Sequence, residues 1–232
     1  MLLVLTMVAA YVFSPSISNS ATATGNDSSK QESKINNDES LLDELAPDGD
    51  EIQLSAVDVI EIGVESKQIR VLQNAGEGFV IKTYSAATAS PKNTKGLPFD
   101  RKGHVTRIVF NPTWTPTENI QKENVAKTGK RLKKTFLPGE DNPLGKAKIF
   151  ISYENGPNDL GIHDTNIQKS VGKRVSHGCN RMYTEDMIEL ASLILGQNDF
   201  DAEEIVRLAK ENPKKTLVIN IANGPDVYYR KK

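Results

Sequence analysis

Short runs of alternating apolar and polar residues, each closed by a turn signal, dominate the chain from Val57 onward. Asn111-Pro112 closes one of these runs, because proline cannot continue a central strand. Glu65-Ser66-Lys67 and Gly76-Glu77-Gly78 are typical of tight turns between neighbouring strands. We therefore predict strands at 57–64, 68–72, 79–84, 105–110, 148–153, 160–163, 216–221 and 227–229. Strands of this number and length predict a mainly β domain, built as a sandwich or barrel with a few peripheral helices.

Three segments show a helical pattern instead. Thr117 is a candidate N-cap for a helix over 117–127. Thr184 is a candidate N-cap for a helix that has acidic residues in its first turn and ends at Gly196. A third helix is predicted over 201–211, just before Pro213.

The amino terminus is a run of apolar residues from Met1 to Phe13, followed by small residues with a candidate cleavage site at Ala21-Thr22-Ala23. A membrane span needs about 20 apolar residues, so this run is too short for a comfortable span. No Lys or Arg precedes the run, as a signal peptide would require. Residues 1–23 are predicted to be a cleaved signal peptide or, failing cleavage, a weak N-terminal membrane anchor. Either way the protein is predicted to be exported.

Residues 24–55 are polar and acidic, which is the composition of a linker that cannot bury a core. Residues 56–230 are then left as one domain of ordinary size. The net charge of the whole chain is -1 and only 6% of its residues are aromatic. Both values argue against a nucleic-acid partner.

Cys179 is the single cysteine of the chain, and two of the three histidines, His163 and His177, lie close to it in sequence. Exported proteins usually keep their cysteines in disulfides, so a lone thiol in such a protein is a candidate reactive group. A thiol nucleophile needs an imidazole nearby to accept its proton, and Gly178 lets a substrate approach the backbone. The helix predicted from Thr184 could also lower the pKa of the thiol. These residues predict covalent cysteine catalysis, with either histidine as the base.

The motif around these residues resembles the catalytic signature of the L,D-transpeptidases, the bacterial cell-wall enzymes with a YkuD-type domain. The matching segments are His163-Asp164-Thr165-Asn166 and Ser176-His177-Gly178-Cys179-Asn180-Arg181-Met182, together with Asn111-Pro112-Thr113-Trp114 and the turn over 138–145. The resemblance covers roughly residues 60–221. Two positions depart from the usual pattern, since Asp164 stands where glycine is common and Asn180 where an apolar residue is common.

The resemblance implies a role for each site residue. Cys179 would be the nucleophile, and His163 the base that forms a thiolate–imidazolium pair and is held by the backbone carbonyl of Asp164. The oxyanion would be stabilised by the backbone N–H groups of Gly178 and Cys179, assisted by His177. Arg181 would organise the loop or bind a substrate carboxylate, and Trp114 would be a core anchor or a wall for the substrate. The remaining implied contributors to the substrate-binding region are Ser176, Asp164 and Thr165.

The implied function is transpeptidation of peptidoglycan stem peptides in the periplasm or cell envelope of a bacterium. A Cys179 thioester would form with release of the terminal D-Ala, and an amine of a second stem or of an envelope protein would resolve it. No metal or organic cofactor is implied. The alternatives are an L,D-carboxypeptidase or hydrolase of the same bonds, a non-catalytic peptidoglycan-binding module, a zinc site at His163, His177 and Cys179, and a cysteine peptidase. Peptidases of that last class usually place the cysteine before the histidine in the chain.

Overall fold

One large, strongly bent sheet contains most of the strands that the alternation predicts. The computed structural model of the chain describes residues 57–73, 79–154, 156 and 160–232. Within them the main sheet has the order β3-β2-β1-β11-β5-β6-β7-β9, with β10 pairing to β5 outside this path. Its strands are β1 (Val59–Gly63), β2 (Gln68–Gln73), β3 (Phe79–Ser85), β5 (Gly103–Phe110), β6 (Ala147–Tyr153), β7 (Gly161–Asp164), β9 (Asn180–Met182), β10 (Leu217–Asn220) and β11 (Asp226–Arg230).

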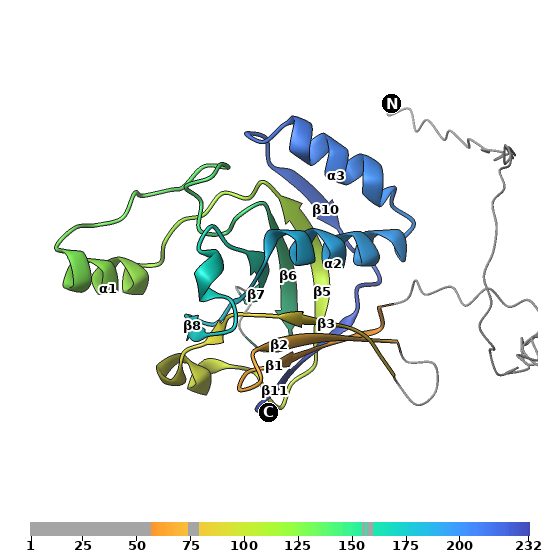
Figure 1. Cartoon of the computed structure of the whole chain (residues 1–232), viewed down its shortest axis with the longest axis horizontal. Helices are drawn as coiled ribbons and strands as arrows, with labels where there is room; N and C mark the ends of the chain where they lie inside the picture. Colours follow the sequence, from red (N-terminus) through yellow and green to blue (C-terminus); the bar gives the residue numbers. More distant parts are fainter. Residues whose placement is uncertain (1–56, 74–78, 155, 157–159) are drawn as a thin grey trace, which may run out of the picture. The chain divides into compact units, whose positions relative to one another are not determined.

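The sheet is antiparallel except where β1 meets β11 and where β7 meets β9. The predicted hairpin is confirmed, because β1 and β2 pair across the 65–67 turn. Figure 1 shows β1, β2 and β3 running crosswise to β5 and β6, and β11 pairs with β1 on one side and with β5 on the other. The mainly β prediction is therefore confirmed, with the sheet turning a corner between β11 and β5.

Three very short strands were not predicted. β4 (Thr88–Ala89) and β8 (Arg174–Ser176) pair with each other in a separate two-stranded sheet. β9, which belongs to the main sheet, is equally short at three residues and also escaped the alternation pattern. A strand can be recognised from alternating apolar and polar residues only when it is longer than these three strands are. β8 and β9 are nevertheless important for the site, because they flank the turn that carries Cys179.

The three predicted helices are present as α1 (Glu118–Thr128), α2 (Thr184–Gly196) and α3 (Ala202–Glu211), and two short 3₁₀ segments, η2 (Pro91–Gly96) and η3 (Gln168–Ser170), are also present. Thr117 and Asp201 are confirmed as N-caps, since their side chains accept hydrogen bonds from Ile120 N and Glu204 N. The predicted Thr184 cap is wrong. Tyr183 holds the N-cap position, and Thr184 is the first helical residue.

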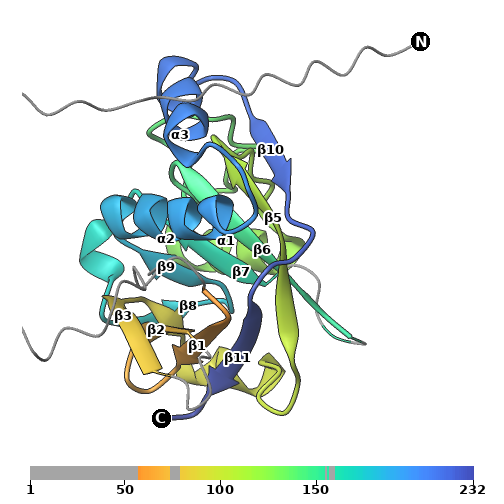
Figure 2. The same ribbon diagram turned by 90° about the vertical axis from the view of Figure 1, so that its right-hand side faces the viewer.

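Helix α2 covers the central strands and completes the core. Its residues Met187, Leu190 and Ile194 are fully buried and pack in the same cluster as the apolar faces of the strands. Figures 1 and 2 show α2 lying across the strands, with α3 and β10 beyond it. Alternating strand residues supply the other half of this core, namely Ile60, Ile62, Ile69, Val71, Ile108, Phe110, Ile149, Ile151 and Ile162. This core holds the ends of β7 and β9 in fixed register.

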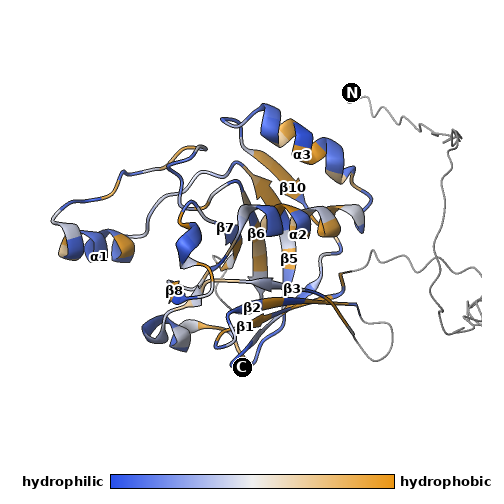
Figure 3. Ribbon diagram, viewed as in Figure 1, coloured by the Kyte–Doolittle hydropathy of each residue, from blue (hydrophilic) through white to orange (hydrophobic). Residues whose placement is uncertain are grey.

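Helix α1 belongs to a separate excursion that we call the flap, residues 114–136. Figure 1 shows α1 projecting from the body on two long arms, and Figure 3 shows that its residues are mainly hydrophilic. The arms meet at Trp114 and Phe136, which exchange backbone hydrogen bonds of 2.9 and 2.7 Å and bring their rings to 5.3 Å. Just outside this Trp114–Phe136 pair, the fully buried Asn142 side chain donates a hydrogen bond to the carbonyl oxygen of Pro112 at 2.6 Å. The two motif segments at 111–114 and 138–145 therefore form the base of the flap.

The predicted amino-terminal segment, the linker and the turn at 76–78 lie outside the described residues. Within the part that is described, none of the helices combines the length and the apolar character needed to cross a bilayer.

Candidate active site

A cleft of about 800 Å³ lies between the flap and the end of the sheet that carries β7 and β9. From the sheet side it is lined by His163, Cys179 and Arg181, and from the flap by residues of α1 and by Trp114. Of the residues predicted from the sequence, the lining includes Cys179, His163, His177, Ser176, Arg181 and Trp114, but not Gly178, Asp164 or Thr165. A smaller apolar hollow of about 260 Å³ beside α2 and α3 contains neither the cysteine nor a histidine.

Cys179 lies in the tight turn between β8 and β9, with its thiol half-buried. Gly178 makes this turn possible, because its φ of 144° is in a region that side-chain-bearing residues avoid. A Cβ at this position would also come within 2.8 Å of Leu160 Cδ2. The glycine is therefore required by the backbone and by the packing of Leu160.

Replacing Gly178 with alanine is expected to lower turnover strongly while the domain stays folded. The added methyl group must displace Leu160 or rotate the turn, and either change moves the thiol of Cys179. Gly172→Ala is the matched control, since Gly172 also has positive φ, at 78°, but a methyl group added there would meet nothing within 4 Å. Turnover and melting temperature are measured for both variants and compared with those of the wild type. Equal loss of turnover in the two would show that backbone strain alone matters.

His163 is buried in the cleft floor, 4% exposed, and its orientation is fixed by one backbone group. Its Nδ1 lies 2.5 Å from the carbonyl oxygen of Asp164, so Nδ1–H donates and Nε2 is left as the acceptor. Burial lowers the pKa of His163 to about 3, and the nearby charges of Lys148 and Arg181 act in the same direction. The imidazole is thus neutral above that pH. Its Nε2 can therefore accept a proton.

The Asp164 side chain has a different task from its carbonyl. Its Oδ1 accepts hydrogen bonds from the backbone N–H groups of Lys146 and Ala147, at 2.6 and 2.8 Å. Its Oδ2 accepts one from the hydroxyl of Thr184 at 3.0 Å. The carboxylate therefore ties the start of β6 to the start of α2, which explains why Thr184 does not cap its helix. The amino terminus of α2 meets this carboxylate, and β9 separates it from Cys179.

Thr165, the next residue after Asp164, is also buried, and its hydroxyl oxygen accepts from Ile167 N at 3.1 Å. It therefore shapes the chain after β7 rather than the cleft.

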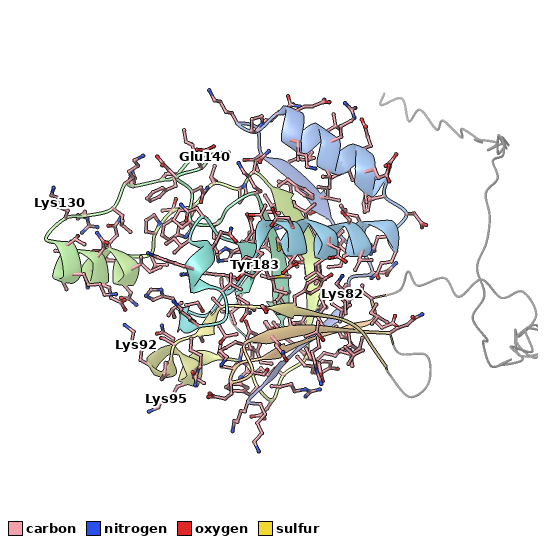
Figure 4. All side chains as sticks on the ribbon, viewed as in Figure 1. Lys82, Lys92, Lys95, Lys130, Glu140 and Tyr183 are labelled. Atoms are coloured by element: carbon pink, nitrogen blue, oxygen red, sulfur yellow. The ribbon has the colours of Figure 1, made fainter. Side chains whose placement is uncertain are left out.

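His177 faces the flap. Its Nε2 lies 2.9 Å from Glu123 Oε2 of α1, and Glu123 Oε1 accepts from Lys92 Nζ at 2.8 Å. Figure 4 shows Lys92 on the η2 segment, beneath α1. The two hydrogen bonds lower the pKa of Glu123 to about 2, that from Lys92 more than that from His177. His177 thus links the cysteine loop to the flap, through partners that no sequence motif identifies.

The cysteine loop is supported from behind by a buried tyrosine. The Tyr229 hydroxyl donates to the carbonyl of Gly178 at 3.3 Å and accepts from Asn180 Nδ2 at 2.8 Å. Asn180 is fully buried, so the unusual polar residue at this position is used to hold Tyr229. On the other side, the N–H of Gly178 donates to Ser176 Oγ at 3.2 Å. That N–H is therefore engaged within the turn, and Ser176 acts on the shape of the turn.

Trp114 lies where the two ends of the flap meet, and there it pairs with Phe136. It is half-buried, stacks against Phe136 and lines the cleft, so it is a wall of the cleft. His104 is exposed on β5. In the described residues no three side chains of His, Cys, Asp or Glu gather as a metal-binding group, so the zinc alternative finds no ligand set there.

Comparison with known proteins agrees with the motif. The model of the YkuD family, the L,D-transpeptidase catalytic domain, matches residues 58–219. YkuD of Bacillus subtilis is 59% identical over 55% of this chain and 90% of its own length. YbiS of Escherichia coli is 37% identical over 40% of this chain, and the match spans only 28% of YbiS. A solved L,D-transpeptidase from Mycobacterium smegmatis is 13% identical over 75% of this chain and 59% of that chain, with a TM-score of 0.38.

The family match covers well over half of the chain and includes every residue of the cleft described above. The relatives YkuD and YbiS are both named as L,D-transpeptidases. This chain therefore belongs to the family of the L,D-transpeptidase catalytic domain.

Proposed function

We propose that this protein is a cysteine-dependent L,D-transpeptidase that acts on the stem peptides of peptidoglycan. The observation that carries the proposal is one cleft lined by the only thiol of the chain and by a buried imidazole. The imidazole is held by the Asp164 carbonyl so that Nε2 is its acceptor nitrogen. A thiol beside such a base is the arrangement that acyl transfer through a thioester requires.

In the first half-reaction the thiol of Cys179 attacks the carbonyl carbon of the diamino acid in a tetrapeptide stem. Nε2 of His163 accepts the thiol proton, and a carbon–sulfur bond forms as the carbonyl oxygen becomes an oxyanion. Collapse of this intermediate breaks the amide bond, and the imidazolium returns its proton to the departing amine of D-Ala. The product is a thioester on Cys179 and free D-Ala.

In the second half-reaction an amine attacks the thioester. Nε2 of His163 accepts a proton from that amine, a new amide bond forms, and the sulfur leaves and regains a proton as the thiol. An amine from a second stem gives a cross-link, and an amine from an envelope protein would attach that protein to the wall. Water in place of the amine gives the carboxypeptidase reaction through the same thioester.

The substrate also implies where the protein works. Peptidoglycan lies in the cell envelope, so the proposed activity requires export. The short apolar run at residues 1–13 and the acidic linker at 24–55 fit a domain that is exported and carried on a tether. We therefore propose an envelope location for the domain.

The test is mass spectrometry of the products that purified protein forms from a disaccharide-linked tetrapeptide stem. The expected product has the mass of two stems less one D-Ala, and free D-Ala appears in equal amount. A trimmed tripeptide stem without the cross-linked product would assign the carboxypeptidase reaction instead. Binding to intact wall without either product would refute the proposed enzyme and leave a binding module.

A further inference from the structure

The end of α1 and the arm that follows it carry a dense group of positive charges. Residues 127–134 contain five cationic side chains and no acidic one, and all five are exposed. We call this group the basic tip, and its members are Lys127, Lys130, Arg131, Lys133 and Lys134. Figure 4 shows Lys130 at the end of the flap that lies farthest from the sheet.

The charge of the flap contrasts with that of the rest of the chain. Residues 114–136 contain six cationic and two acidic side chains, which gives the flap a net charge of +4. The whole chain has a net charge of -1, so the residues outside the flap carry -5 in total. Positive charge is therefore concentrated on one projecting segment of an almost neutral protein.

The backbone that carries the basic tip is held against α1 by two amide side chains. Asn124 Nδ2 donates to the carbonyl oxygen of Lys130 at 2.7 Å. Buried Gln121 accepts from Leu132 N at 2.8 Å through Oε1, and its Nε2 donates to the Leu132 carbonyl oxygen at 3.3 Å. Because these hydrogen bonds already order the backbone, a partner can bind the cations without first having to order a loop.

Acidic side chains neutralise only part of the charge of the basic tip. Glu118 Oε2 lies 2.9 Å from an Arg131 guanidinium nitrogen, and Asp141 Oδ2 lies 3.4 Å from Lys133 Nζ. All four of these side chains are more than half exposed, so both ion pairs are weak. The other three cations of the tip form no salt bridge with any side chain that the structure describes.

The basic tip is separate from the active-site cleft. Helix α1 lines the cleft through its first turns, including Lys122 and Glu123, whereas residues 127–134, all of them described, do not line it. The tip contains no aromatic side chain, and its one apolar residue, Leu132, is half-buried. It therefore offers neither a stacking surface for nucleic-acid bases nor an apolar anchor for a bilayer. What it presents to a partner is charge.

We infer that the basic tip is a docking surface for a linear polyanion built of linked phosphate groups. Four of its five cations are lysines, whose compact ammonium groups bind phosphate as point charges, without the planar fork by which arginine matches a carboxylate. Five cations within eight residues can contact several neighbouring phosphates of one polymer, and each contact releases condensed counterions. Because the tip lies outside the cleft, a bound polymer would hold the domain in place and leave the cleft open to its own substrate.

The test measures binding of the whole protein to long-chain inorganic polyphosphate at several salt concentrations, with no stem peptide present. For wild-type protein the logarithm of the binding constant should fall linearly with the logarithm of the salt concentration. A variant that combines Lys127→Gln, Lys130→Gln and Lys134→Gln should show a slope smaller by about 2, since each lost contact accounts for about 0.7. Its affinity at low salt should be about 10-fold lower or less.

The matched control combines Lys210→Gln, Lys214→Gln and Lys215→Gln. These three lysines are also exposed and lie at and just after the end of α3, so the control makes the same change in net charge on another surface. It should bind polyphosphate as the wild type does, and both variants should keep the melting temperature of the wild type. Equal weakening in the two variants, or none in the tip variant, would overturn the docking surface.

Two further probes test the identity of the partner. Wild-type protein should bind polyphosphate more tightly than it binds vesicles of phosphatidylglycerol or single-stranded DNA, and the reverse order with either probe would overturn the assignment to a phosphate polymer. The inference does not depend on the proposed function, because no binding measurement uses turnover. Turnover of a soluble stem by the tip variant should equal that of the wild type, and its loss would show that the tip belongs to the cleft after all.

Discussion

A chain carrying Cys179→Ala is expected to form neither cross-linked nor trimmed stem peptide. The sequence contains no second cysteine that could replace the nucleophile, and the described site offers His163 only as a proton acceptor. The thiol is half-buried in a turn supported by Gly178 and Tyr229, so its loss should leave the fold intact. The change therefore separates chemistry from stability.

The matching measurement is intact-mass analysis with a carbapenem-type β-lactam, whose strained ring imitates an acyl donor. Wild-type protein should gain the mass of one inhibitor, and Cys179→Ala should gain none while showing the same circular dichroism spectrum and melting temperature. Substantial stem-peptide turnover by the alanine variant, or an equal mass gain in both proteins, would exclude the thiol mechanism.

His163→Ala is expected to slow turnover by about 10²–10⁴-fold, the usual contribution of a general base. With the imidazole gone, the proton of Cys179 can no longer move to Nε2, and thiolate forms only by ionisation into solvent. The pH at which Cys179 reacts with iodoacetamide should therefore rise.

His177→Ala should behave differently, because His177 is bound to Glu123 of the flap. We expect it to lower turnover through the shape of the cleft and to leave the pH dependence of alkylation close to that of the wild type. Alkylation rate against pH for the three proteins is the measurement. If the His177 variant shifts the profile and the His163 variant does not, the two roles are reversed.

The longer strands and all three helices could be predicted from the sequence, because each carries enough residues to show its period. β8 and β9 could not, since strands of three residues show no alternation and are held by their neighbours. The Thr184 cap was a reasonable local prediction that failed for a non-local reason. The hydroxyl that would have capped α2 donates to Asp164, which is twenty residues away in the chain.

The site residues that belong to the sequence motif around Cys179 could be predicted. The residues that reach the site only through the pairing register of neighbouring strands could not. Cys179, His163 and His177 lie in or near one segment and were found together. Lys148 reaches the same cleft only because β6 pairs with β7 in one particular register. Nothing in the residues around Lys148 distinguishes it from any other lysine in a strand, so only the pairing of strands could have identified it.

The flap differs from the rest of the domain in what holds it together. Gln121 is the only buried residue of α1, and it is engaged by the backbone of Leu132 and Lys133 within the flap itself. Local opening of such a segment exposes little apolar surface, so its free energy is separate from that of global unfolding. Opening of the flap would break the hydrogen bonds of Glu123 with Lys92 and His177 and widen the cleft, while the core beneath the thiol stays packed.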